Sequence, residues 1–552
     1  MTRMILLAAS TAATALLAAP AQADTLYHNL DGLHASASGE LQRFAGMIVD
    51  DDGRIVALVE PGGALPSAVD EMVDLQGAHV LPGLIDAHGH VMGLGLAALD
   101  TELDLTGTAS IEELQQRVAA HAAAHPDLPW ITGRGWNQEL FSDGRLPSAA
   151  DLDAVVADRP VWLGRVDGHA AVGNSAAMRL AGITAETADP DGGAVLRDEA
   201  GQATGVFVDA AEALVNVHIP APDAARMDAA LIAAQDFLLS QGITAIADMG
   251  TSIADWHAFR RAGDADALNV RIMSYAAASA PAAAIAGTGP TPWLYDDRLR
   301  MGGIKLYSDG ALGSRGALLK ADYEDDHGNR GLPVMSGEQL REQAGWAAER
   351  GFQLAIHAIG DAANAEVISI FEELGSGHEA RHRIEHVQIL DPADLPRLSA
   401  AGIIASMQPV HQTSDWQMAE KRLGMDRLGG AYAWKSLLDA GTRLALGSDV
   451  PVEHPNPFVG LKVAVTREDA QGSPRGGWRA QEALTLGQAL AGFTGWAAYA
   501  GMADGRFGSL QPGAHADFII VDRDISAVSP QAIADTEVIA TYVDGEAVWV
   551  AP

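Results

Sequence analysis

The sequence predicts an α/β protein: a (β/α)8 barrel of the TIM type, with a small β domain built from both chain ends and a large insertion after the first barrel strand. Eight short apolar runs, each followed by a helical pattern, indicate parallel βα units, and eight such units close into a barrel. Asp-Gly hairpin patterns near both ends predict the β domain. The long gap after the first run, residues 91–240, predicts the insertion.

The first 23 residues have the pattern of a secretory signal peptide. Arg3 precedes an uncharged run from Ile5 to Ala19, and Ala21-Gln-Ala23 ends the segment. This 15-residue run is short for a bilayer core of about 30 Å at 1.5 Å per residue, so an uncleaved anchor is the weaker alternative. We expect cleavage before Asp24 and a secreted, periplasmic protein with no stable membrane anchor.

Each end of the remaining chain contains a strand, a tight turn and a second strand. Asp52-Gly53 separates two β-branched runs near the N-terminus, and Asp544-Gly545 does the same near the C-terminus. Two-stranded hairpins are only marginally stable alone, so we expect residues 24–80 and 505–552 to pair into one domain. Two separate edge hairpins are the alternative.

The barrel is predicted to occupy residues 81–504. Its strands are expected at Leu84–His88, Ile243–Ala247, Val270–Ser274, Gly303–Tyr307, Phe352–Ile356, Arg383–Val387, Ile403–Met407 and Arg443–Gly447. Residues 91–240 leave from the carboxyl end of the first strand, which is the end where the active sites of such barrels lie. We therefore expect the insertion to cover the barrel mouth as a cap.

The composition excludes several classes of function. The 552 residues include 36 Lys and Arg against 72 Asp and Glu, a formal net charge of −36, which disfavours nucleic acid and anionic membranes as partners. The chain has no cysteine, which excludes thiol nucleophiles, disulfides and Cys-ligated metals. Any metal must be held by His or carboxylates. We expect a small-molecule substrate, and a homo-oligomer is compatible with the sequence.

Candidate metal ligands lie at the ends of the predicted strands. The first strand ends in Asp86-Ala-His88-Gly-His90, and residues two apart on a strand face the same side, so both imidazoles can face the barrel mouth. Lys305, His357, His386 and Asp449 lie at or near later strand ends. Each also has a purely structural interpretation, as a salt bridge, a core histidine or a helix cap. Their shared position at one end of the ring favours a common site.

These motifs resemble the amidohydrolase superfamily of metal-dependent hydrolases, and within it the branch called amidohydrolase family 3 or YtcJ-like. The resemblance extends from the N-terminal hairpin to residues 508–517, nearly the whole mature chain. It is carried by Leu81–His90, Arg165–His169, Lys305–Gly310, Ile356–Asp361, Arg383–His386, Gln408-Pro409 and Gly447–Pro451.

The resemblance implies that His88, His90 and Asp449 bind one metal ion and that His357 and His386 bind a second. It also implies that Lys305 bridges the ions as a carbamate, because an unmodified ammonium would repel a dication. We expect two Zn²⁺ ions, although nickel, manganese and iron accept the same ligand types. Metal-bound hydroxide would attack the substrate, and Asp449 would carry the proton to the leaving group.

Four further residues are candidate substrate contacts. His169 lies in the insertion and either reaches down to polarise the substrate or only fixes the cap. Asp309 and Arg315 follow the fourth strand and His411 follows the seventh, near the expected mouth. Core packing is favoured over a pocket lining for Trp136, Trp416, Trp434 and Trp478.

The leading hypothesis is a secreted hydrolase that cleaves a non-peptide C–N bond in an amide or cyclic amide. An esterase, lactonase or phosphotriesterase on the same site is the first alternative, because attack by metal-bound hydroxide does not depend on the leaving atom. A non-catalytic binding protein on a barrel scaffold is the second, and the position of Asp449 argues against it. The substrate itself cannot be deduced from the sequence.

Overall fold

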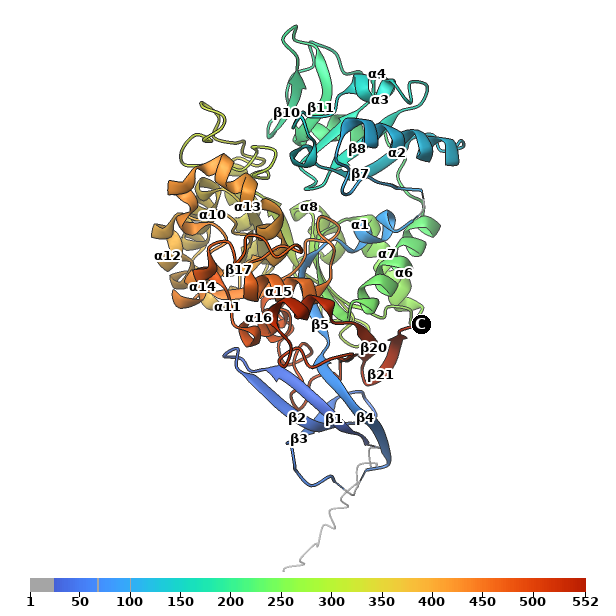
Figure 1. Cartoon of the computed structure of the whole chain (residues 1–552), viewed down its shortest axis with the longest axis vertical. Helices are drawn as coiled ribbons and strands as arrows, with labels where there is room; N and C mark the ends of the chain where they lie inside the picture. Colours follow the sequence, from blue (N-terminus) through green and yellow to red (C-terminus); the bar gives the residue numbers. More distant parts are fainter. Residues whose placement is uncertain (1–23, 67–68, 100) are drawn as a thin grey trace, which may run out of the picture.

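The computed structural model describes residues 24–66, 69–99 and 101–552, and its architecture confirms the predicted fold class (Figure 1). The predicted signal peptide, residues 1–23, lies outside the described residues. Within the described ranges, no helix is both long enough and apolar enough to cross a membrane.

Eight parallel strands form the barrel sheet, in the order β18-β17-β16-β15-β14-β13-β12-β5. An isolated parallel bridge between Gly89 and Val450 joins its first and last strands, so the ring is nearly closed. All eight predicted runs contribute strands, and their bounds are β5 (Leu84–Gly89), β12 (Ile243–Thr251), β13 (Arg271–Ala276), β14 (Leu299–Tyr307), β15 (Gln353–Ala358), β16 (Arg383–His386), β17 (Ile404–Met407) and β18 (Arg443–Leu446).

Small side chains fill much of the barrel interior. Ala87, Ala245, Ala355 and Ala445 come from four different strands and belong to one buried cluster. Alanines of α17 join this cluster. The barrel centre is therefore packed and not an open pore, and the site must lie at the strand ends.

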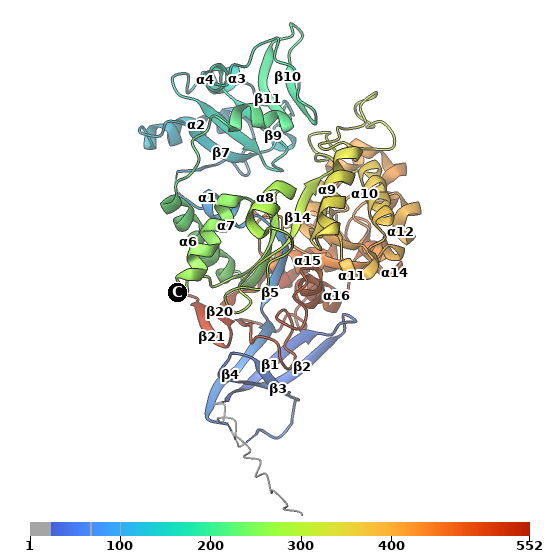
Figure 2. The same ribbon diagram turned by 180° about the vertical axis from the view of Figure 1, so that it is seen from behind.

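Helices surround the barrel and form, with the outward faces of its strands, the largest hydrophobic core (Figures 1 and 2). They are α1 (Val91–Ala97), α6 (Ala224–Ser240), α7 (Ile253–Asp264), α8 (Ser279–Ala286), α9 (Gly337–Glu349), α10 (Asp361–Leu374), α11 (Gly377–Ala380), α12 (Leu395–Ala400), α13 (Pro409–Leu423), α14 (Trp434–Asp439), α15 (Pro457–Thr466), α16 (Leu486–Gly492) and α17 (Gly495–Ala500). Short 3₁₀ helices are η3 (Pro392–Asp394), η4 (Met425–Gly430), η5 (Ala480–Glu482) and η6 (Pro530–Asp535).

The insertion between β5 and β12 folds around its own six-stranded sheet, ordered β10-β11-β9-β8-β7-β6. Buried clusters lie on both faces of this sheet. In both views it stands over one end of the barrel (Figures 1 and 2). Its elements are β6 (Leu103–Asp104), α2 (Ile111–Ala124), β7 (Ile131–Trp136), η1 (Gln138–Leu140), α3 (Ala149–Asp153), β8 (Val161–Arg165), β9 (Ala170–Gly173), α4 (Ser175–Leu180), β10 (Gly193–Arg197), β11 (Ala203–Asp209), η2 (Ala210–Glu212) and α5 (Ala213–Asn216).

Strands from both chain ends form a single seven-stranded sheet, ordered β21-β20-β19-β4-β1-β2-β3. The two ends meet where β4 pairs antiparallel with β19, with Pro82 opposite Phe518. β4 then continues through Gly83 into β5 of the barrel. The strands are β1 (Thr25–Ala35), β2 (Leu41–Val49), β3 (Ile55–Val59), β4 (Glu71–Pro82), β19 (Phe518–Val521), β20 (Val538–Val543) and β21 (Glu546–Val550).

Candidate active site

A cavity of about 800 Å³ lies between the cap and the carboxyl ends of the barrel strands. The cap contributes Arg165, Asp167 and His169 to its lining, and the barrel contributes His357 and Asp449. This volume lies in the range of small-molecule pockets. The cap and the barrel therefore each form a part of one candidate site.

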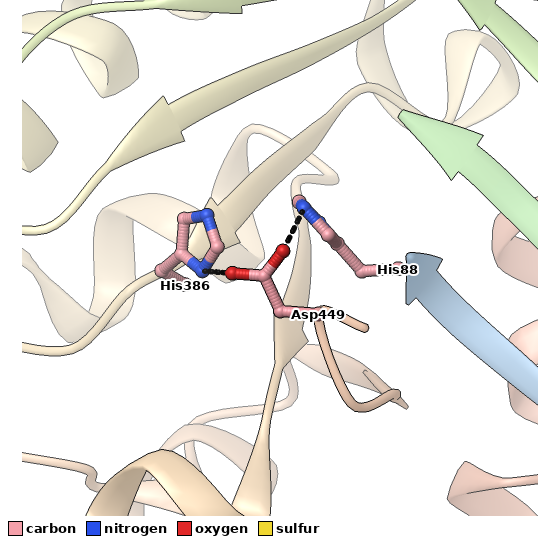
Figure 3. Close-up of side chains that lie close together, drawn as sticks. All are labelled: His88, His386 and Asp449. Carbon is pink, nitrogen blue, oxygen red and sulfur yellow. Dashed lines mark ion pairs between the residues drawn. The ribbon is translucent and has the colours of Figure 1, made fainter. Parts of the chain in front are cut away.

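Three side chains from different strand ends converge below the cap, and two of them, His386 and Asp449, line the cavity (Figure 3). His88 is the penultimate residue of β5, His386 ends β16 and Asp449 follows β18. Each offers one ligand atom, and these atoms lie within 4.8 Å of one another. Nε2 of His88 is 3.4 Å from Oδ1 of Asp449, and Nδ1 of His386 is 4.0 Å from Oδ2. Two imidazoles and one buried carboxylate are a donor set that fits a divalent metal such as zinc.

His90 lies beside the three converging residues, whereas Nε2 of His357 is directed toward the loop after β14. Nε2 of His90 is 3.0 Å from Oδ1 of Asp449. Nε2 of His357 faces the carbonyl oxygen of Gly310 and a carboxylate oxygen of Asp309, at 3.5 Å each. The structure therefore groups His386 with His88 and Asp449. The ring centres of His386 and His357 are also 4.6 Å apart, and their binding of a second ion stays a prediction.

The backbone is strained at two of the three converging residues. His386 has a φ of 77° and Asp449 a φ of 64°, both in the left-handed region that non-glycine residues rarely adopt. Such strain persists only where neighbouring contacts fix the conformation, and it is common at functional sites.

Asp86 provides one of these fixing contacts. Its carboxylate accepts hydrogen bonds from the N–H groups of His88 (3.1 Å) and Ser448 (2.9 Å) and from the Ser448 hydroxyl (2.5 Å). The approach requires Gly447, where a Cβ would lie 2.4 Å from Oδ1 of Asp86. Asp86 thus connects the strand that carries His88 to the loop that carries Asp449, and burial raises its pKa to about 6.

Glu385 orients His88 from across the barrel. Its carboxylate accepts a 2.6 Å hydrogen bond from Nδ1 of His88, which leaves Nε2 directed toward Asp449. Arg383 donates to the same carboxylate at 2.5 and 3.0 Å, and both side chains are fully buried. Burial works to raise the pKa of Glu385, but Arg383 and His88 hold it well below its usual value. A carboxylate behind a histidine is a common support for metal ligation.

Lys305 is buried at the centre of the group. Its Nζ lies 3.3 Å from Nε2 of His88 and 4.8 Å from the ring centre of Tyr307. Burial lowers the pKa of Lys305 to about 8, although the Glu385 and Asp449 carboxylates oppose this shift. Lys305 therefore lies close enough to the three converging residues to share one site with them.

The charge on Asp449 is stabilised inside the protein. Burial works to raise its pKa, but the neighbouring imidazoles of His88 and His90 hold it well below the usual value. Nε2 of His411 is 3.7 Å from its other oxygen. Asp449 is therefore an anion surrounded by imidazoles, which is the state that a metal ligand requires.

Of the four predicted substrate contacts, the structure places two in the cavity wall. His169 and His411 line the cavity, whereas Asp309 and Arg315 do not. Asp309 is fully buried and accepts backbone hydrogen bonds from Leu318, Ile359 and Gly360, so it holds the loops together. Arg315 turns away and forms an ion pair with Asp325 at 3.0 Å. Neither side chain lines the cavity, and their contact with substrate stays a prediction.

Sequence reasoning missed the orienting residues Glu385, Arg383 and Asp209. One signal was present: Arg383 and Glu385 lie two apart on a strand and so face the same side. Two opposite charges on the inner face of a buried strand indicate that they bind a further polar side chain inside the barrel. Of the four tryptophans, Trp416 lines the cavity, and Trp136, Trp434 and Trp478 are at most 7 % exposed core residues.

The nearly closed barrel, its cap and the buried ligand set at the strand ends define a metal-dependent hydrolase. The chain belongs to the amidohydrolase family, whose family model matches residues 71–549.

Curated relatives and a solved structure agree with this assignment. "Protein LONG AFTER FAR-RED 3" of Arabidopsis thaliana is 34 % identical over 86 % of this chain and 83 % of its own length. "Putative amidohydrolase YtcJ" of Bacillus subtilis is 31 % identical over 87 % and 90 %. "N-substituted formamide deformylase" of Arthrobacter pascens is 26 % identical over 88 % and 90 %. The crystal structure of an uncharacterized metal-dependent hydrolase from Pyrococcus horikoshii OT3 superposes with a TM-score of 0.74 at 27 % identity, covering 92 % of this chain and 99 % of that one.

Proposed function

We propose that this protein hydrolyses a non-peptide C–N bond in a small amide or cyclic amide. The observation that carries the proposal is the set of His88, His386 and Asp449, of which His386 and Asp449 line the cavity below the cap. A relative that matches nearly the whole chain carries the name of an N-substituted formamide deformylase, which supports an amide as the substrate class.

The residues that would hold the metal are His88, His386 and Asp449, with His90 beside them. Zinc suits this nitrogen and carboxylate set, and a second ion would draw on His357 after its side chain turns. A bound divalent metal polarises a carbonyl and supplies a nucleophilic water near neutral pH. We include in the proposal that the Lys305 ammonium first loses a proton, and that the free amine then reacts with CO2, forming an N–C bond and releasing a second proton. The resulting carbamate would replace an ammonium, a group without a lone pair, beside His88.

The protein's own residues would then manage the proton and exclude water. Asp449 faces the cavity and would hold the proton lost by the attacking water until the leaving nitrogen takes it. Glu385 would keep His88 in the tautomer with Nε2 free for the metal. The cap would shield the reacting groups from bulk solvent.

The cavity wall favours a neutral or cationic substrate. Asp104, Glu139, Asp415 and Glu453 line it, and among the residues that the structure describes Arg165 is the one Lys or Arg in the lining. That guanidinium is already paired with Asp167. An anionic substrate would therefore meet repulsion on most sides.

The test is metal analysis of the purified protein, followed by a panel of N-butylformamide, acetanilide, phenyl acetate, a γ-lactone and a phosphotriester. We expect divalent metal in the protein, turnover of at least one amide, and loss of turnover after chelation with recovery on adding Zn²⁺. Turnover restricted to esters, lactones or phosphotriesters would overturn the C–N assignment. An absence of turnover across the panel with full metal occupancy would favour a binding protein.

A further inference from the structure

A histidine of the cap faces the barrel's site and is held there by a buried carboxylate. Nδ1 of His169 lies 2.6 Å from Oδ1 of Asp209. Their backbones are also joined, since the N–H of Asp209 donates to the carbonyl oxygen of His169 at 3.2 Å. His169 lines the cavity, and its ring centre is 5.0 Å from that of His357. The cap thus places an imidazole against the residues of the barrel floor.

The position of Asp209 has no structural justification within the cap alone. Its side chain is only 2 % exposed, and Oδ2 has no hydrogen-bond partner in the described part of the chain. Its backbone, at φ 50° and ψ −123°, lies in a region that is strained for a non-glycine residue. A strained, half-satisfied buried carboxylate is unfavourable for folding and is found where function requires it.

The barrel is shaped to receive this carboxylate. Gly310 and Gly316 follow β14, the strand that carries Lys305. A Cβ built on Gly310 would lie 2.5 Å from Oδ2 of Asp209, and one on Gly316 would lie 3.0 Å from it. The absence of a Cβ at these two glycines leaves the space that the Asp209 carboxylate occupies, and we call this space the glycine cradle. Asp209 therefore bridges the cap's histidine and the barrel's fourth strand.

We propose that His169 is a substrate-binding residue that the cap supplies to the site, and that Asp209 in its glycine cradle is the positioning residue that holds it. An ionised carboxylate only accepts hydrogen bonds, so Nδ1 of His169 must donate to it. Nε2, on the opposite side of the ring, has no partner among the described residues and is the atom left to hydrogen-bond the polar group of a small amide. This inference rests on the proposed function and deepens it, because it makes the cap a part of substrate recognition.

A double-mutant cycle tests the pair on an amide that the wild type turns over. His169→Gln should lower kcat/KM by about 10²-fold, and Asp209→Asn by about 10-fold. Because Asp209 acts through His169, adding Asp209→Asn to His169→Gln should cause no further loss. Metal content and melting temperature should stay within error, and Asp198→Asn in the cap hairpin is the matched control. Additive losses, or a loss that tracks melting temperature, would show a structural clamp instead.

The cradle gives a second test from the barrel side. Gly310→Ala should reproduce the loss of Asp209→Asn, because the new methyl group occupies the space of Oδ2. In an Asp209→Ala background the same Gly310→Ala change should be harmless, because the clash is gone. Gly345→Ala on α9, where no atom lies within 4 Å of the added Cβ, is the control. A Gly310→Ala enzyme with wild-type kcat/KM would show that Gly310 is not needed to position Asp209.

A binding measurement separates this inference from the proposed function. In protein with ¹⁵N-labelled histidine, the His169 ring is assigned by its loss in His169→Gln. N-butylformamide is then titrated into the metal-loaded protein. A shift of the Nε2 resonance that saturates, and that is weakened by Asp209→Asn, supports the role of His169 even if no amide is hydrolysed. An unchanged Nε2 resonance at saturating N-butylformamide, with turnover intact, would overturn it.

Discussion

Asp449 combines two tasks at the scale of a single residue. It lies within reach of His88, His90 and His386, and we assign it the transfer of a proton to the leaving group. In Asp449→Asn the amide oxygen still coordinates weakly, so metal content should fall only in part. Turnover should fall about 10²- to 10⁴-fold, because the acid and base function is gone. Steady-state kinetics at matched metal occupancy measure the effect.

The leaving group provides the control for that variant. An activated phenyl ester needs no proton on its leaving group, whereas an anilide does. The loss in Asp449→Asn should therefore be smaller for the ester. Equal losses on both substrates would mean that Asp449 is only a ligand.

Glu385 should act on metal binding through His88. Replacing Glu385 by Gln removes the anionic acceptor from Nδ1 of His88, so the affinity for Zn²⁺ should fall about 10- to 100-fold. The variant also leaves Arg383 without its anionic partner, so its melting temperature should fall as well. Competition with a chelator, at a temperature where circular dichroism shows a folded protein, gives the affinity. Glu372→Gln is the control, because this glutamate of α10 has an exposed side chain that also pairs with an arginine. An unchanged Zn²⁺ affinity in Glu385→Gln would show that Glu385 does not orient His88.

At this scale the sequence predicts the residues that carry chemistry better than those that position them. His88, His386 and Asp449 are predictable because strand ends of a parallel barrel face one mouth. Asp209 is not, because its role depends on a glycine cradle about 100 residues further along the chain. The direction of Arg315 is not predictable for a related reason: a loop residue near a strand end can turn either way, and its ion pair with Asp325 decides the direction.

The cap is the element on which substrate handling should depend most. It has its own sheet and buried clusters, and the chain enters and leaves it next to α1 and α6. Replacing residues 101–222 with a short linker should leave a folded barrel with greatly reduced kcat/KM, because His169 and one wall of the cavity are lost. Circular dichroism and kinetics on the same sample check this.

A milder variant controls for misfolding of the deletion. Arg134 of β7 donates to the carbonyl oxygens of Pro451 and Val166 and so ties the cap to the loop after β18. Arg134→Ala should raise KM while the protein stays folded. Full activity in the deletion and in Arg134→Ala would show that the cap does not shape the site.

The elements themselves followed from sequence pattern to a large extent. Apolar runs with helical segments between them predict the barrel strands, and Asp-Gly turns predict the outer hairpins. The order of strands in the cap sheet could not be predicted. Its sheet mixes parallel and antiparallel pairs, and pairs such as β9 with β11 depend on long-range packing that a periodicity does not encode.

The whole molecule should show pH-dependent stability at the junction of the barrel and the small sheet. His515 is fully buried, with Nε2 3.1 Å from Asp297 and Nδ1 paired with Asp544. Burial works to lower the pKa of His515, but the two carboxylates raise it above the ordinary 6.5. The stability it contributes is thus complete below pH 6.5 and is lost as the pH rises through the folded pKa.

Urea unfolding between pH 5.5 and 9 tests whether the stability contributed by His515 falls as the pH rises. The wild type should lose stability relative to His515→Gln as the pH rises above 6.5. The pKa of Asp297 is lowered to about 2 by His515 and Arg506 against the effect of burial, so this carboxylate stays charged throughout and does not cause the change. A constant difference in unfolding free energy between the two proteins would contradict the assignment.

Export is a property of the whole chain as well. We propose that residues 1–23 direct secretion and are removed, which places the mature N-terminus at Asp24. Mass spectrometry of the protein from its native host should find Asp24 first. Retention of Met1 or Thr2 would exclude the cleavage.

The sheet that joins the two chain ends imposes an order on biosynthesis. β4 leaves the ribosome early, but its partner β19 begins at Phe518, more than 400 residues after the pairing residue Pro82. At about 5–20 residues per second this edge stays unpaired for about 20 seconds or longer. An unpaired edge strand is a template for aggregation, so this edge of the nascent chain is exposed to association until the last strands emerge. Truncation before β19 should therefore yield an aggregating chain in which barrel and cap sequences are complete.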